Sequence, residues 1–327
     1  MQELILDYVF KVGWALPTIK YQSIINILTM KNKIIKSLLL SLSIITLTAC
    51  NNPENLALQE NQPESINSEL QELNQPQRIV ALTSLTADII YQLNPDKLIA
   101  IPGSSLTRND PRFADYPTVS EGNAPPNLEK IVSLKPDLVI GAEGFSDQTL
   151  ARLEEVGIKT MSTSVGSWES LTELTQNLAS IMGENPQTLL DNYQRWIPAQ
   201  ANPDISMLVL VSRQPILAPN KNSWAGDLLT QFQFKNVLAD LQGSSQFGGY
   251  VTLSPEKILE TDPEIIILVD PGQQGIEEQM KAESFWGNLR AVKEDNVHVF
   301  DYFGLVNPGS TVKVEETVNQ LSALMEK

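Results

Sequence analysis

Few side chains in this chain have types that could perform chemistry. Its 327 residues include one cysteine, Cys50, and one histidine, His298. A single cysteine excludes an internal disulfide and any zinc or iron–sulfur site built from several cysteines. A lone histidine cannot supply the ligands of a metal-ion receptor, so we expect no metal site. The sequence has no nucleophile elbow, P-loop or Gly-x-Gly-x-x-Gly segment, so we expect a binding protein and not an enzyme.

Cys50 ends a segment with the composition of a secretory signal. Lysines between residues 31 and 36 form a positive region, and residues 37–46 form an apolar stretch too short to span a bilayer. Leu47-Thr48-Ala49-Cys50 resembles the bacterial lipobox, in which the cysteine becomes the lipidated first residue of the mature protein. We therefore interpret residues 1–49 as a signal peptide with an N-terminal extension, and Cys50 as the lipidation site.

Residue composition also indicates where translation starts and where a flexible tether lies. Met30 directly precedes the basic region, so we interpret Met30 as the real start, in place of Met1, and residues 1–29 as a mis-called extension. The residues after Cys50, up to residue 77, are rich in Asn, Gln, Glu and Pro and poor in apolar side chains. Such a composition cannot bury enough apolar surface to fold, so we expect residues 50–77 to form a flexible tether.

The net charge of the chain limits the classes of partner that it can bind. The formal charge is −16, and removing residues 1–49 takes away five lysines and two acids, which leaves −19. Nucleic acids bind basic surfaces, so this balance argues against a nucleic-acid partner. An anionic membrane surface would also repel the domain, and attachment must then come from the lipid on Cys50. We expect a periplasmic location, with the protein anchored to a membrane by this lipid.

Two stretches of similar pattern contain Glu129 and Glu256, which stand 127 residues apart. Residues 127–141 and 254–268 each contain a helix-capping residue, a glutamate at the second helical position, an apolar stripe, a proline turn and an apolar strand. A second pair of similar segments, 84–93 and 223–232, precedes them in the same order. Two repeats in one order predict two similar lobes.

The coarse pattern predicts an α/β fold. Strands and helices alternate with short joints, which is typical of parallel sheets with helices on their faces. We expect an N-terminal lobe over 78–165, a helical connector over 166–204 and a C-terminal lobe over 205–327. Ligands of such sheets bind at the carboxyl ends of the strands, so the loops there form the candidate binding surface.

The two glutamate-containing stretches are similar to the hallmark of a known family. Leu128-Glu129-Lys130-Ile131 with Pro136-Asp137-Leu138-Val139-Ile140 resembles the class III periplasmic binding proteins, which serve ABC importers of ferric siderophores, cobalamin and haem. Ser254-Pro255-Glu256-Lys257-Ile258-Leu259 resembles the second-lobe counterpart, and the resemblance covers about residues 77–327. It implies two Rossmann-like lobes joined by a long connecting helix, with the ligand in a cleft between the lobes.

The same resemblance implies the partners. One glutamate on each lobe of these proteins pairs with arginines of the two permease subunits, and by position these are Glu129 and Glu256. Spacing alone also fits a second interpretation, in which each glutamate complements the positive end of a helix dipole, worth about 0.3–1 kcal/mol. We expect a monomer that docks on an ABC permease dimer and needs no cofactor.

Aromatic walls and a few cations suit the large, flat-faced ligands of this family. Tyr250 and Asn123 each stand six residues before a docking glutamate, and Trp224 opens a helix where a core tryptophan is less needed. The predicted ligand-binding residues are Asn123, Phe145, Trp168, Arg213, Trp224, Tyr250 and Tyr302.

Structural roles without ligand binding also fit several of these residues and other residues of the same loops. Packing between a lobe and a helix equally fits Trp168 and Tyr302, and a surface ion pair equally fits Arg213. Arg108 and Arg112, in the long loop over 102–126, are interpreted as solvated charges.

Asn123 bears on the identity of the cargo. Cobalamin binders of this family often have an aromatic side chain where this chain has Asn123, which favours a polar iron chelate. We therefore predict a receptor that delivers a ferric siderophore, an Fe(III) chelate, to an ABC permease. The alternatives are a cobalamin or haem receptor of the same family and a scaffold lipoprotein that has lost its ligand.

Overall fold

The computed structural model describes residues 75–122, 124–198, 205–242, 248–270 and 275–325. The predicted signal peptide, the lipidation site Cys50, the tether up to residue 74 and Asn123 lie outside these residues. Within the described ranges, no helix is long and apolar enough to cross a membrane.

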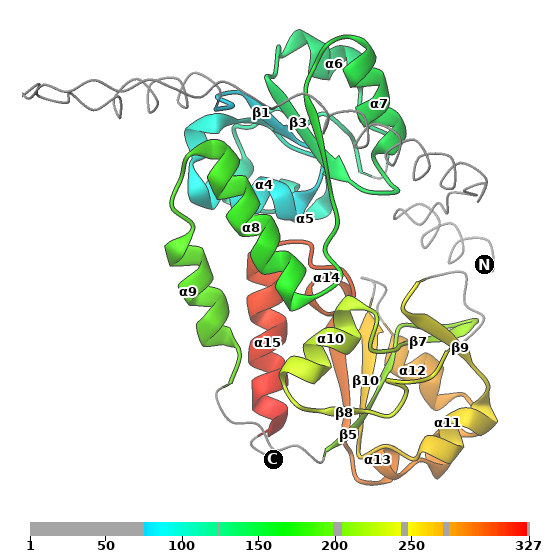
Figure 1. Ribbon diagram of the computed structural model, residues 1–327. Helices are drawn as coiled ribbons and strands as arrows, with labels where there is room; N and C mark the ends of the chain where they lie inside the picture. Colours follow the sequence, from blue (N-terminus) through cyan, green and yellow to red (C-terminus); the bar gives the residue numbers. More distant parts are fainter. Residues whose placement is uncertain (1–74, 123, 199–204, 243–247, 271–274, 326–327) are drawn as a thin grey trace, which may run out of the picture. The chain divides into compact units, whose positions relative to one another are not determined.

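The N-terminal lobe contains a four-stranded parallel sheet (Figure 1). Its strands are β1 (Ile79–Ala81), β2 (Leu98–Ala100), β3 (Leu138–Ala142) and β4 (Thr160–Thr163), in the order β2-β1-β3-β4. The helices between them are α4 (Ser84–Leu93), α6 (Leu128–Ser133) and α7 (Asp147–Glu155). The long loop between β2 and α6 contains a short helix, α5 (Ser105–Arg108), and a 3-10 turn at Pro111–Phe113.

The C-terminal lobe repeats this arrangement. Its parallel sheet has the order β11-β10-β5-β8, from β5 (Ser206–Leu210), β8 (Lys235–Asn236), β10 (Ile265–Asp270) and β11 (Val297–Asp301). The helix α10 (Trp224–Gln231) takes the place of α4, and α11 (Pro255–Thr261) takes the place of α6. The first strand lies between the second and the third in both sheets, which confirms the predicted α/β fold with two similar lobes.

A third sheet of the C-terminal lobe differs from the prediction. The strands β6 (Ser212–Arg213), β7 (Ile216–Pro219) and β9 (Tyr250–Leu253) form an antiparallel sheet in the order β6-β7-β9. The sequence pattern does not indicate this sheet, because glycine and proline flank its strands and their pairing partners are distant in sequence.

Helices connect the two lobes. The chain leaves β4 through α8 (Trp168–Met182) and α9 (Gln187–Trp196), and no strand occurs in the described residues between β4 and β5. The final helix, α15 (Thr311–Met325), follows α14 (Tyr302–Leu305). In Figure 1, α15 runs beside α9, and both helices contact each other.

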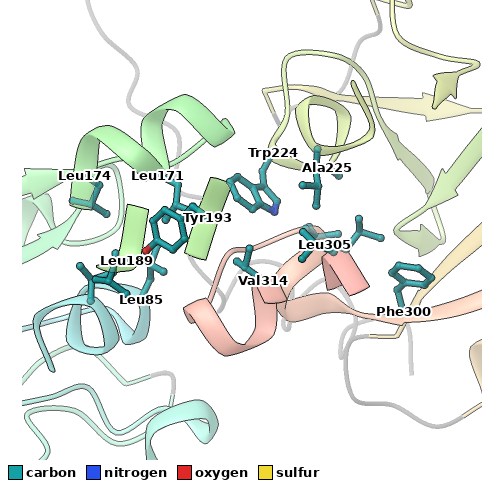
Figure 2. Close-up of a cluster of buried hydrophobic side chains, with 14 of the residues drawn as sticks. Leu85, Leu171, Leu174, Leu189, Tyr193, Trp224, Ala225, Phe300, Leu305 and Val314 are labelled. Atoms are coloured by element: carbon teal, nitrogen blue, oxygen red, sulfur yellow. The ribbon is translucent and has the colours of Figure 1, made fainter. Parts of the chain in front are cut away.

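Alternating strand residues divide the core into three clusters. One cluster fills the outer face of the N-terminal sheet and includes Val80 and Val139, and another fills the outer face of the C-terminal sheet and includes Leu208 and Ile266. The largest cluster takes the alternate residues of both sheets together with the connecting helices. Figure 2 shows part of it, with Leu85, Leu171, Leu174, Leu189, Tyr193, Trp224, Ala225, Phe300, Leu305 and Val314 labelled. Apolar packing of this kind ties both lobes to α8, α9 and α15.

Candidate functional site

The two helices with the candidate docking glutamates begin in the same way. Asn127 caps α6, and its side chain accepts the backbone N–H of Lys130, while Ser254 caps α11 and accepts that of Lys257. A short polar side chain is favoured at this position because it satisfies a backbone donor of the first turn. Glu129 and Glu256 are then the second residue of each helix, as the sequence pattern predicted.

The C-terminal ends of α6 and α11 are also stabilised in similar ways. Lys135 and Asp262 follow α6 and α11, and both have a left-handed backbone with φ of 50° and 36°. The Arg78 side chain donates to the carbonyl oxygens of Leu134 and Lys135, at 2.6 and 3.1 Å. Arg290 donates to the carbonyl of Asp262 at 3.4 Å. An arginine near a helix C-terminus satisfies carbonyl groups that lack a partner in the helix.

An acid after each proline turn fixes the helix to the first strand of its lobe. Asp137 accepts the backbone N–H groups of Gln77 and Arg78, at 2.7 and 3.0 Å. Glu264 accepts the backbone N–H of Ser206 and its hydroxyl, both at 2.8 Å. These backbone and hydroxyl hydrogen bonds lower the pKa of Glu264 below its usual value of 4.5. Both glutamate helices are therefore rigidly placed relative to their sheets.

Glu129 and Glu256 themselves are exposed. Among the described residues, neither carboxylate has an ion-pair partner. Hydrogen bonds from its own backbone N–H and from the Ser254 hydroxyl lower the pKa of Glu256, so this group is ionised at neutral pH. Two exposed carboxylates on matching helices can form ion pairs with cations of a partner at low cost in desolvation.

Phe145 is a candidate ligand-binding residue that stays on the surface. It lies in the turn between β3 and α7, at the carboxyl end of the strand, and 45% of it is exposed. The next residue, Ser146, is buried and its hydroxyl accepts the N–H of Ala142 at 3.1 Å. The turn is therefore anchored beneath Phe145, and the ring is available to a ligand.

Trp168 and Trp224 come together, although they are the first residues of different helices. Their rings stack with centroids 6.0 Å apart and an interplanar angle of 24°. Trp224 is only 3% exposed, and its indole N–H donates to the carbonyl of Gly304 at 2.7 Å. The reason that singled out Trp224, a helix start with little need for a core tryptophan, is wrong, because this ring is part of the core shared by α8 and α10.

The three remaining candidates lie in the C-terminal lobe and do not form one group. Arg213 on β6 donates to Glu283 at 2.7 Å, which fits the ion-pair interpretation. Tyr250 opens β9 and is buried; burial, and secondarily the nearby Tyr302, raises the pKa of its hydroxyl. In the antiparallel sheet, Arg213 stands opposite Ile216, and Tyr250 stands opposite Pro219. These two candidates therefore lie at opposite ends of β7. Tyr302 is half-buried after β11 and meets Phe303 edge to face at 5.4 Å.

One buried polar group was missed by sequence reasoning. Asp88 on α4 is fully buried, and its carboxylate accepts the backbone N–H and the hydroxyl of Thr311, at 2.7 and 2.6 Å. Arg112 lies 2.9 Å from the same carboxylate, and Gln92 donates to it at 3.1 Å. The interpretation of Arg112 as a solvated charge is therefore wrong, whereas Arg108 is exposed. Asp88 and Thr311 are 223 residues apart, so no local pattern could pair them.

A second acid in the repeated segments has a matching role. Asp227 on α10 accepts the backbone N–H of Trp168, the first residue of α8, at 2.7 Å. Asp88 and Asp227 occupy the same position in the similar segments 84–93 and 223–232. The signal that could have found them was this repeat, since a shared acid inside an otherwise apolar pattern needs a polar partner.

A metal centre is not visible in the part of the chain that the structure describes, where no three potential ligands among His, Cys, Asp and Glu are grouped closely enough to hold an ion. His298 lies on β11, and its ring nitrogen is 3.2 Å from the Asn296 side-chain oxygen. This contact fits a structural histidine.

The comparisons with known proteins agree with this geometry. A family model described as "periplasmic binding protein" matches residues 79–302, which is more than half of the chain. The uncharacterized ABC transporter substrate-binding lipoprotein YvrC of Bacillus subtilis is 24% identical over 292 residues, covering 80% of this chain and 88% of that protein.

Two further similar proteins are named for what they bind or transport. The vitamin B12-binding protein of Salmonella paratyphi A is 28% identical over 205 residues, covering 60% of this chain and 73% of that protein. The crystal structure of an ABC-type Fe3+-hydroxamate transport system from Saccharomonospora viridis is similar at a TM-score of 0.57 and 20% identity, covering 77% of this chain and 93% of that chain. A structural likeness at this identity establishes a common fold.

Proposed function

Because this chain belongs to the periplasmic binding protein family and is the non-enzymatic substrate-binding component of an ABC importer, we propose that it captures a ferric siderophore and delivers it to the permease. The lipid on Cys50 holds the mature protein at the membrane, on the extracytoplasmic side. The observation that carries the delivery step is the pair of exposed carboxylates, Glu129 and Glu256, at one position of two matching helices.

Geometry supports docking of this pair more than a dipole role. A glutamate that only complements its helix dipole needs no counterpart on another lobe. Here the capping residue, the left-handed residue after the helix and the acid that follows the proline recur in both lobes. A partner with two equivalent subunits offers two equivalent cationic sites, which matches a receptor with two equivalent acids.

Aromatic side chains at the strand ends bear on the choice of ligand. The exposed Phe145 ring at the end of β3 and Tyr302 at the end of β11 offer aromatic faces at the carboxyl edges of both sheets. Such faces suit an iron chelate with apolar arms. The relative from Saccharomonospora viridis belongs to an Fe3+-hydroxamate system, and this supports a ferric hydroxamate as the first chelate to test. The Salmonella paratyphi A relative, a vitamin B12-binding protein, makes cobalamin the second candidate.

A tryptophan-fluorescence titration of the mature chain tests the cargo. The panel is a ferric hydroxamate, a ferric catecholate, ferric citrate, cyanocobalamin and haemin, with calorimetry to remove optical artefacts. The stacked Trp168 and Trp224 rings join α8 to α10 and report on movement between these helices. We expect saturation by the ferric hydroxamate alone. Saturation by cyanocobalamin or haemin alone would contradict the siderophore proposal and leave the importer assignment in place.

Phe145→Ala sharpens the same test. Removing an exposed ring that stacks on a ligand should raise the dissociation constant about two- to tenfold, since an aromatic contact contributes about 0.5–1.5 kcal/mol. Val156→Ala is the matched control, because Val156 follows the other end of α7 and is also exposed. Equal affinities of the wild type and both variants would mean that Phe145 does not touch the ligand.

A further inference from the structure

Each docking glutamate has an exposed aliphatic side chain one helical turn later. Val132 follows Glu129 on α6, and Leu259 follows Glu256 on α11, both at a spacing of three residues. Residues three apart lie side by side on one face of a helix. Ile131 and Ile258, which directly precede these aliphatic residues, are fully buried, so the opposite face of each helix holds it to its lobe.

These two side chains belong to a small group of exposed large apolar residues. Val132 is 43% exposed and Leu259 is 38% exposed. Across the described part of the chain, the other large apolar side chains with comparable exposure are Phe145, Val156, Ile181, Val299 and Val312. Among the described residues, these five have no counterpart of similar type and exposure in the other lobe, whereas Val132 and Leu259 occupy one position of the repeat. Chance exposure would not be expected to respect the repeat.

We infer that Glu129 with Val132, and Glu256 with Leu259, form two equivalent composite docking surfaces, each covered by one subunit of the permease dimer. This inference rests on the proposed docking function and adds its apolar half. The occupant follows from the charge and the repetition: an unpaired carboxylate selects a cationic partner, and two equal surfaces select a partner with two equal subunits.

The two halves of each surface have different physical roles. An exposed carboxylate attracts its cation over several ångströms and loses this attraction as salt rises. An aliphatic side chain acts only at contact, where its burial excludes water from the ion pair and slows dissociation. The inference therefore predicts that acids and aliphatic residues both contribute to affinity but respond differently to ionic strength.

The test uses the mature chain and the permease dimer with its ATPase subunits, reconstituted in nanodiscs. The dissociation constant of the complex is measured across a series of salt concentrations for Val132→Ser/Leu259→Ser, for Glu129→Ala/Glu256→Ala and for the wild type. We expect the aliphatic double variant to bind about tenfold more weakly with an unchanged salt slope. The glutamate double variant should bind at least about tenfold more weakly with a flatter salt slope.

A matched control removes two aliphatic side chains elsewhere. Val156→Ser/Ile181→Ser has the same chemistry at comparable exposure, 61% and 37%, and should bind as the wild type does. Wild-type affinity of Val132→Ser/Leu259→Ser, with weak binding of the glutamate variant, would overturn this inference and keep the proposed docking. Wild-type affinity of both would overturn the docking assignment as well. Equal weakening by the control pair would also overturn the inference, since it would reflect general surface hydrophobicity.

Discussion

Asp88 and Asp227, two acids at the same position of the two lobes, make the same kind of hydrogen bond in different surroundings. Each accepts the backbone N–H of the first residue of a helix, Thr311 of α15 or Trp168 of α8, at 2.7 Å. The helix α15 follows the last strand of the C-terminal lobe, and α8 follows the last strand of the N-terminal lobe. Each lobe therefore supplies an acid that holds a helix arriving from the other lobe.

The difference between the two acids is burial and its consequence. Asp88 is fully buried and has Arg112 at 2.9 Å, while Asp227 is half-buried and has no ion-pair partner among the described residues. A buried carboxylate costs several kcal/mol in lost hydration unless a cation and hydrogen bonds compensate it. Arg112 comes from the long loop after β2, so this loop stabilises the joint between the lobes.

Among the substitutions proposed here, Asp88→Asn should destabilise the protein most, because it disrupts the buried contact between Asp88 on α4 and Thr311 at the start of α15. The substitution keeps the shape but leaves Arg112 without its buried partner and places an amide N–H₂ near an N–H donor. We expect the free energy of unfolding to fall by about 3 kcal/mol, measured by urea denaturation of the mature chain. A fall below 1 kcal/mol would mean that the burial of Asp88 is not compensated by Arg112 in the way that we describe.

Arg112→Gln tests the same joint from its exposed side. The guanidinium is partly open to water, so its loss costs less than that of the buried acid, and we expect about 1–2 kcal/mol of destabilisation. Arg108→Gln, on the same loop and exposed, is the control and should leave the urea midpoint unchanged. Equal midpoints for the two variants would contradict the role assigned to Arg112.

Asp227→Asn should have a smaller effect than Asp88→Asn. Water can replace part of the lost interaction with the Trp168 N–H, so a loss of about 1 kcal/mol is expected, close to that of a helix cap. The tryptophan emission spectrum of the protein provides a second readout, because this backbone contact lies beside the Trp168–Trp224 stack. A destabilisation equal to that of Asp88→Asn would erase the difference between the two lobes.

The smallest expected effect is a pH dependence of stability at Asp110, which pairs with Arg112 at 2.6 Å. Hydrogen bonds from the Arg112 side chain lower the pKa of Asp110 below its usual 3.8. A lowered pKa contributes stability that is present above pH 3.8 and is lost as the pH falls through the folded-state pKa. Asp110→Asn should therefore flatten the urea stability profile below about pH 4. A profile parallel to that of the wild type would show that this pair does not contribute.

How much the sequence could predict differs between local and distant features. The two helices that contain Glu129 and Glu256, their caps and the order of elements follow from patterns within about fifteen residues, where helix periodicity and proline turns act directly. Asn127 and Ser254 cap their helices as expected. The sheet β6-β7-β9 and the burial of Trp224 were not anticipated, because short strands and helix starts become buried only through partners elsewhere in the chain.

The amino-acid sequence alone determined the two-lobe α/β plan and the placement of Glu129 and Glu256, because both depend on repeated local patterns that form wherever their apolar faces can be buried. The tertiary structure decided which polar groups meet. Thr311 and Asp88 are separated by 223 residues, and Arg112 becomes a counter-ion only when the loop after β2 folds against α4. A carboxylate within an apolar segment signals a need for a partner, but only the packed chain identifies that partner.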